Sequence, residues 1–174
     1  MPYEGFVVEI ADGTTPSIAW GQWLGGSDDD YVFGLAVIGD EIYAGGYTSS
    51  KTNWESITWQ GSYSGGYDGF VVEIADNDTT NIPSIAWGQW LGGSGTDYVE
   101  ALAVNGDEIH AAGYAGADST TWGESITWQG SFNGAVEGYL AEIADDGGGE
   151  GGSGATGAAI GGGTVILNNA IINN

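Results

Sequence analysis

The sequence predicts an all-β repeat protein, and three observations lead to this prediction. The block that begins at Tyr3 recurs at Tyr67 and starts again at Val136, so the period is 64 residues (67 minus 3) and then 69 (136 minus 67). Every copy divides into short segments of β-type composition separated by Gly, Asp, Asn and Ser. No stretch shows a sustained helical period with caps. Repeats of this length bury their cores by stacking neighbouring units.

Five strands are expected in each copy. The first contains the apolar run Phe6-Val7-Val8, the second alternates around Trp20, the third and fourth flank Gly39-Asp40, and the fifth contains the string Ser-Ile-Thr-Trp-Gln-Gly. Gly and Asp between apolar strands suit a tight hairpin that needs positive φ, and Gly106-Asp107 repeats this turn. The expected strands are residues 5–11, 18–25, 32–38, 41–47 and 56–61, then 69–75, 85–92, 99–104, 108–114 and 125–130.

Alternation along the second strand places large side chains on both of its faces. Simple alternation puts Ile18, Trp20 and Gln22 on one side and Ala19, Gly21 and Trp23 on the other. A strand with an aromatic side chain on each face is expected to pack between two layers, as when blade-like sheets stack face to face.

The order of these blocks resembles the SBBP repeat of β-propellers. The resemblance rests on Gly-Phe-Val-Val-Glu-Ile at 5–10, on Ile-Ala-Trp, Leu-Gly-Gly-Ser and Asp-Tyr at 18–31, and on Leu-Ala-Val with Gly-Asp-Glu-Ile-Tyr-Ala-Gly-Gly-Tyr-Thr-Ser at 35–49. It covers residues 3 to 145. It implies four-stranded blades of the kind found in bacterial or archaeal surface and secreted proteins, and it implies no catalytic residues.

On this pattern, a blade runs outward from 35–37 through 42–47 and 70–74 to 85–91. The chain then contains a half blade (6–10 and 18–24), one whole blade, and a second blade that lacks its outer strand after 140–143. These propeller-like antiparallel blades are too few to close a ring alone. Each copy also carries an aromatic segment that the family pattern lacks, at 54–63 and 122–132.

Composition excludes several classes of function. The formal charge is -23, Lys51 is the one cationic side chain and His110 the one histidine, and there is no Cys. Such a polyanion cannot neutralise nucleic-acid phosphates and is repelled by anionic membranes. It offers no thiolate for a metal site or for catalysis. No apolar run is long enough to span a membrane, and an extracellular or cell-surface location is expected.

The C-terminal segment predicts a strand that needs a partner. Residues 147–163 have the Gly-rich composition of a flexible tether, and residues 164–174 form a strand candidate without a charged side chain. That strand either completes the second blade of its own chain or adds to the sheet of a neighbour. The third alternative is that the chain is a fragment of a larger propeller. The expected units are 1–66, 67–135, 136–146, 147–163 and 164–174, and the assembly strand consists of Val165, Ile166, Leu167, Ala170, Ile171 and Ile172.

Acidic turns are the candidate metal ligands. Asp28, Asp30 and Asp97 provide oxygen ligands of the kind that Ca²⁺ prefers, and Asp30 and Asp97 fall at the same place in both copies. The acidic segments do not follow the spacing of an EF-hand. The favoured interpretation is therefore that these are turn residues bonded to their own backbone, so no cofactor is required and Ca²⁺ is the only candidate.

Four tryptophans are candidates for glycan recognition. Trp54, Trp59, Trp122 and Trp128 lie beside Gln60 and Gln129, and flat rings beside amide donors suit sugar stacking. Packing between sheets or subunits is the favoured alternative. The Glu residues recur with the repeat, whereas catalysis needs one asymmetric constellation, so no enzyme is expected.

Together these features predict a non-enzymatic structural subunit of an extracellular filament or surface assembly. It would polymerise with copies of itself through strand addition of the tail. The alternative is a secreted β-repeat module that binds carbohydrate or protein, with a cell-surface glycan or protein as its partner.

Overall fold

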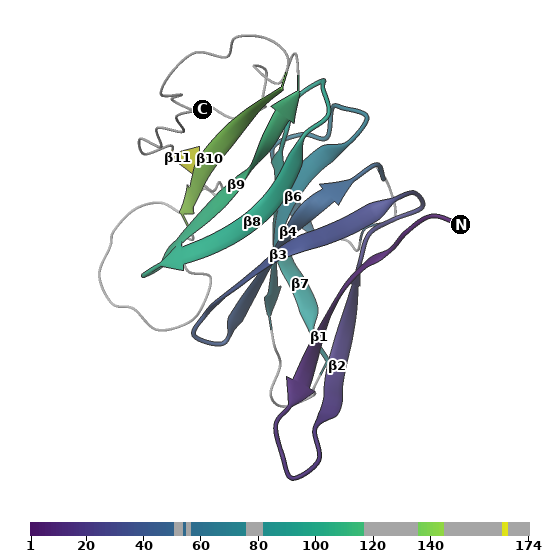
Figure 1. Cartoon of the computed structure of the whole chain (residues 1–174), viewed down its shortest axis with the longest axis vertical. Helices are drawn as coiled ribbons and strands as arrows, with labels where there is room; N and C mark the ends of the chain where they lie inside the picture. Colours follow the sequence, from purple (N-terminus) through teal and green to yellow (C-terminus); the bar gives the residue numbers. More distant parts are fainter. Residues whose placement is uncertain (51–53, 55–56, 76–81, 117–135, 145–164, 167–174) are drawn as a thin grey trace.

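The computed structural model describes residues 1–50, 54, 57–75, 82–116, 136–144 and 165–166. Within them the chain consists of strands joined by turns, with no helix, which confirms the all-β prediction. The strands form three separate sheets and no closed barrel (Figure 1). The expected strand at 125–130 lies outside the described residues.

The first sheet is a half blade, as predicted. It is a two-stranded antiparallel sheet of β1 (Gly5–Ala11) and β2 (Ser17–Leu24). The second sheet, here called the first blade, has the order β3-β4-β6-β7-β5. Its strands are β3 (Asp30–Ile38), β4 (Glu41–Thr48), β6 (Asp68–Ala75), β7 (Ser84–Leu91) and β5 (Thr58–Gln60). The first four strands are antiparallel and follow the predicted order, and β5 adds in parallel to β7.

The third sheet, here called the second blade, has the order β8-β9-β10-β11. Its strands are β8 (Tyr98–Asn105), β9 (Glu108–Gly116), β10 (Val136–Ala144) and β11 (Val165–Ile166). The hairpins β3–β4 and β8–β9 turn at Gly39 and Gly106, whose φ angles are 59° and 64°. These left-handed conformations favour Gly and explain the predicted Gly-Asp turns.

The three sheets stack face to face, and two hydrophobic clusters fill the spaces between them. We call the face of each sheet that looks toward the preceding sheet its upstream face, and the opposite face its downstream face. The downstream face of the half blade packs on the upstream face of the first blade through Val7, Trp20, Leu24, Ala44, Phe70, Val72, Ile74, Ile85 and Trp90. The downstream face of the first blade packs on the second blade through Tyr43, Val71, Leu91, Val99, Ile109, Ala111, Ala115, Tyr139, Ala141 and Ile143.

Strand β6 shows the consequence of this stacking, because seven of its eight residues are buried. The first blade is therefore covered on both faces. The same packing was predicted for the strand at 18–25, and there the prediction is wrong, because Ile18 and Trp23 are exposed on the upstream face of the half blade. Figure 1 shows the half blade (purple) at one end of the molecule and β8–β10 (teal to green) at the other.

Simple alternation along β2 is wrong at one position. The register shifts between Glu9 and Ile10, so that Trp20 pairs with Glu9 while Ile18 pairs with Ile10. This bulge leaves Ala19 unmatched and turns Ile18 and Trp20 to opposite faces. Trp20 is buried against the first blade, whereas Ile18 is exposed on the upstream face.

Candidate functional site

The outer edge of β10 is the place where the second blade differs from the first. Strand β6 pairs along seven residues with its outer neighbour β7. Strand β10 pairs along nine residues with β9 but along only two with β11. Among the described residues, β11 is the strand on the outer side of β10, and it lies opposite Glu142 and Ile143. A strand at the edge of a sheet can receive a further strand through its backbone N–H and C=O groups.

The C-terminal segment reaches this edge within its own chain. Val165 pairs with Ile143 and Ile166 pairs with Glu142, in antiparallel register. Of the two predicted arrangements, this is the one in which the tail completes its own second blade, and it covers two residues of the edge. The other residues of the predicted assembly strand, Leu167, Ala170, Ile171 and Ile172, lie outside the described residues.

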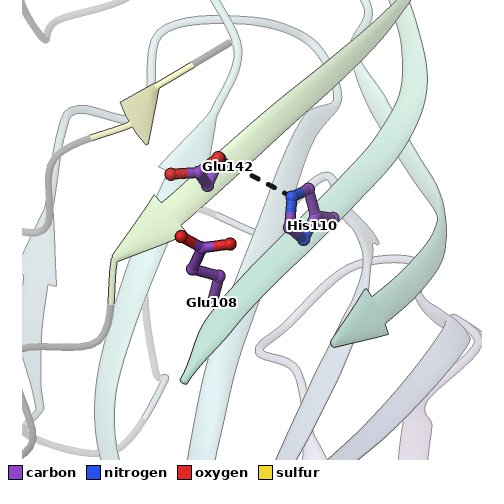
Figure 2. Close-up of side chains that lie close together, drawn as sticks. All are labelled: Glu108, His110 and Glu142. Carbon is purple, nitrogen blue, oxygen red and sulfur yellow. Dashed lines mark ion pairs between the residues drawn. The ribbon is translucent and has the colours of Figure 1, made fainter. Parts of the chain in front are cut away.

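A histidine lies between two glutamates beside this edge. His110 on β9 and Glu142 on β10 are directly opposite in register, and Ala144 is opposite Glu108. The Nε2 atom of His110 is 3.7 Å from a carboxylate oxygen of Glu142, and ligand atoms of all three side chains lie within 4.8 Å of one another (Figure 2). Glu142 is buried and Glu108 is exposed.

This cluster was not predicted from the sequence. His110 takes the place of Tyr43, whose hydroxyl donates a hydrogen bond to Glu41 at 2.9 Å in the first blade. The signal in the sequence was the i, i+2 spacing of Glu108 and His110, which puts both side chains on one face of a strand. One imidazole and two carboxylates suit a divalent transition metal such as Zn²⁺, and a protonated His110 would form an ion pair with Glu142.

The predicted metal ligands do not form such a cluster. Among the described residues, the group with metal-binding geometry contains neither Asp28, Asp30 nor Asp97. Asp30 is buried and accepts hydrogen bonds from the Gly26 N–H at 2.8 Å, the Ser50 hydroxyl at 3.3 Å and the Thr48 hydroxyl. Burial raises the pKa of Asp30, and these hydrogen bonds act in the opposite direction.

Asp97 has the same function in the second blade, where it accepts hydrogen bonds from the N–H groups of Gly93 (3.0 Å) and Gly116 (3.1 Å). Asp28 is exposed, and its own N–H donates to the Ser50 hydroxyl at 2.7 Å. Asp30 and Asp97 thus close equivalent turns, in line with the favoured interpretation of these residues. A Ca²⁺ ion at these positions stays a prediction.

Two of the four predicted aromatic candidates belong to the packing between sheets. Trp54 and Trp59 are half-buried against the cluster that joins the half blade to the first blade. The ring of Trp59 stacks on Trp90 with centroids 3.9 Å apart, and Trp54 meets Phe70 edge-on at 4.9 Å. Trp122 and Trp128 lie outside the described residues.

No known family model and no curated protein sequence matches this chain. The resemblance to the SBBP repeat therefore stays a prediction. The part of the chain that the structure describes contains no helix long and apolar enough to cross a membrane.

Proposed function

We propose that this chain is a non-enzymatic structural subunit of an extracellular filament or surface assembly. Copies would join when the C-terminal segment of one chain pairs with the outer edge of β10 in another. The observation that carries the proposal is that the C-terminal segment supplies the outer neighbour of β10, where Val165 pairs with Ile143 and Ile166 pairs with Glu142.

A tail that pairs with a neighbouring copy makes the same backbone contacts as a tail that pairs within its own chain. The register that pairs Val165 with Ile143 and Ile166 with Glu142 can form equally with a neighbour's β10, because backbone hydrogen bonds do not depend on which chain supplies the strand. Exchange of the strand between copies therefore costs little enthalpy. The protein concentration then decides whether the tail pairs within its own chain or with another copy. A contact of this kind is head-to-tail and yields a ring or an open filament.

The composition supports self-association in a saline exterior. With a formal charge of -23, copies repel one another until salt or cations screen the carboxylates. The tail from 164 to 174 has no charged side chain, so pairing it with another chain removes no charge from water. The partner proposed here is a second copy of the chain, and no nucleic acid takes part.

The alternative proposal is a secreted module that binds carbohydrate or protein. It requires exposed aromatic rings on each repeat. Trp54 and Trp59 give it little support because they pack against Phe70 and Trp90. The proposal of a structural subunit is therefore preferred.

A disulfide trap tests the proposal directly. The chain has no cysteine, so introduced thiols have no background. One batch carries Glu142→Cys and the other Ile166→Cys, two positions that face each other across β10 and β11. Mixed under oxidising conditions, the two batches should form a covalent dimer, because paired strand positions lie within disulfide distance. Glu137→Cys, on β10 but outside the β11 register, is the matched control and should give a much weaker band.

The outcome that contradicts the proposal is equally clear. If a chain with both Cys substitutions closes its own disulfide and the single variants never link to each other, the tail stays in its own subunit. Negative-stain electron microscopy and sedimentation of the parent chain complete the test. Filaments or rings are expected, and a chain that ends at Asp146 should remain in smaller species.

A further inference from the structure

The upstream face of the half blade is an exposed apolar surface. Phe6 is 57% exposed, whereas Phe70, at the same position of the next copy, is fully buried. The same contrast holds for each further residue of this face. Its apolar side chains are Phe6, Val8, Ile10, Ile18 and Trp23, and their buried counterparts in the first blade are Phe70, Val72, Ile74, Ile85 and Trp90.

The molecule itself shows what such a face packs against. The upstream face of the first blade lies on the downstream face of the half blade, and the upstream face of the second blade lies on the downstream face of the first. The same sequence pattern thus forms the same type of interface twice within one chain. The half blade has a third upstream face with this pattern. We therefore expect it to pack against a third downstream face.

That third downstream face exists at the other end of the stack. It belongs to the second blade and displays alternate residues of β9 and β10. Tyr114 and Val136 are exposed on it, and Ala112 and Leu140 are half-buried. Ala112 occupies the position of Gly45, where an added Cβ would touch Val99 and Leu102 of the following blade. In the first blade this position is therefore part of a close interface between sheets.

We infer that copies of this chain stack end to end, with the upstream face of one half blade on the downstream face of another copy's second blade. This inference deepens the proposed function and rests on its premise that copies associate. It names an interface that the tail does not form. Because the two faces differ, the contact is head-to-tail and continues from copy to copy.

The glutamates on the downstream face do not prevent this contact. Glu142 is the counterpart of Glu73, and Glu73 is already buried on the downstream face of the first blade. The interface within the chain therefore accommodates a carboxylate at this position. The net charge of -23 on each copy opposes the contact at long range, so stacking should strengthen as salt is added.

Two isoleucines of equal exposure provide a matched test. Ile18 lies on the upstream face and Ile82 lies outside the strands, and each is 68% exposed. Ile18→Lys and Ile82→Lys change the net charge by the same amount. Sedimentation velocity in high salt should show that Ile18→Lys weakens self-association by at least about tenfold, because it buries a charge in the interface. Ile82→Lys should behave like the parent chain.

A complementation experiment tests the head-to-tail geometry. Ala112→Lys blocks the downstream face and leaves the upstream face intact, and Tyr114→Glu is a second variant of the same face should Ala112→Lys fail to fold. Each blocked variant alone should lose end-to-end stacking and keep only the association that the tail supplies. A mixture of Ile18→Lys with a downstream variant should regain one stacking contact per pair of chains and form a mixed dimer through it, because one functional copy of each face remains. Unchanged association of Ile18→Lys, or the absence of a mixed dimer, would overturn the inference.

These outcomes are distinguishable from failure of the proposed function. The disulfide trap between positions 142 and 166 reports on the tail, and Ile18→Lys leaves both positions unchanged. Cross-linked tails with no effect of Ile18→Lys would support strand addition and refute stacking. An effect of Ile18→Lys without cross-links between chains would support stacking and refute strand addition.

Discussion

The ring of Tyr47 in the first blade lies edge-on against the ring of Tyr98 in the second, with 4.3 Å between the centroids and 78° between the planes. Tyr31 stacks on Tyr47 with 4.7 Å between the centroids. Burial is the main cause that raises the pKa of Tyr47 to about 12, and the neighbouring tyrosines add to it. These rings join the two blades by contacts that require neutral phenols.

Stability should therefore fall in strong alkali. The pKa of Tyr47 rises from 10.0 in the unfolded chain to about 12 in the folded one. Between these values the unfolded state loses a proton that the folded state keeps, so the contribution of Tyr47 is complete below the lower value and is lost as the pH rises through the higher. Urea unfolding of the parent should show a falling midpoint in this window. Tyr47→Phe should flatten the fall, and an unchanged slope would refute the assignment.

A close backbone approach makes one glycine of each blade irreplaceable. A Cβ at Gly46 would overlap the carbonyl oxygen of Tyr31, and a Cβ at Gly113 would overlap that of Tyr98. Both glycines lie opposite bulges, between Val32 and Gly34 and between Val99 and Ala101. We expect Gly46→Ala to lower the free energy of unfolding by about 2 kcal/mol or more, because backbone must move.

Gly66→Ala is the control for this prediction, since a Cβ there meets no atom within 4 Å. It should leave the unfolding free energy within about 0.5 kcal/mol of the parent. Chemical denaturation of both variants provides the measurement. Equal stabilities of the two variants would show that the strands relax around position 46 without cost.

Asp97 should contribute to stability through the turns that it closes. Its carboxylate accepts hydrogen bonds from two buried N–H groups, those of Gly93 and Gly116. Asp97→Ala leaves both donors without this acceptor and should cost about 2 to 4 kcal/mol of unfolding free energy. Asp107→Ala removes an exposed carboxylate of equal charge and should be nearly neutral. If added Ca²⁺ stabilises Asp97→Ala as much as it stabilises the parent, Asp97 is a purely structural residue.

The sequence predicted the features that depend on the order of neighbouring residues along the chain. The turn glycines Gly39 and Gly106, the apolar segments and the repeat itself predicted the strands, and the resemblance to the SBBP repeat implied the order within the first blade and the half blade. The bulge opposite Glu9 and Ile10 could not be predicted in this way, because it is a property of how two strands pair. The approach of His110 to Glu142 also depends on the pairing of β9 with β10. The sequence shows both residues but not that their strands lie side by side.

The same limit applies to the aromatic candidates, and Trp59 decides between their two interpretations. Its ring stacks on Trp90 and lies over Gly88, where an added Cβ would collide with it. If packing is its function, Trp59→Ala should lower the unfolding free energy by about 2 to 4 kcal/mol. Trp23→Ala, which removes the exposed half-blade counterpart of Trp90, should cost less than about 1 kcal/mol. Urea denaturation of both variants, followed by titration of the parent with soluble oligosaccharides, checks the prediction. A stable Trp59→Ala variant that had lost an oligosaccharide affinity measured for the parent would instead support the binding module.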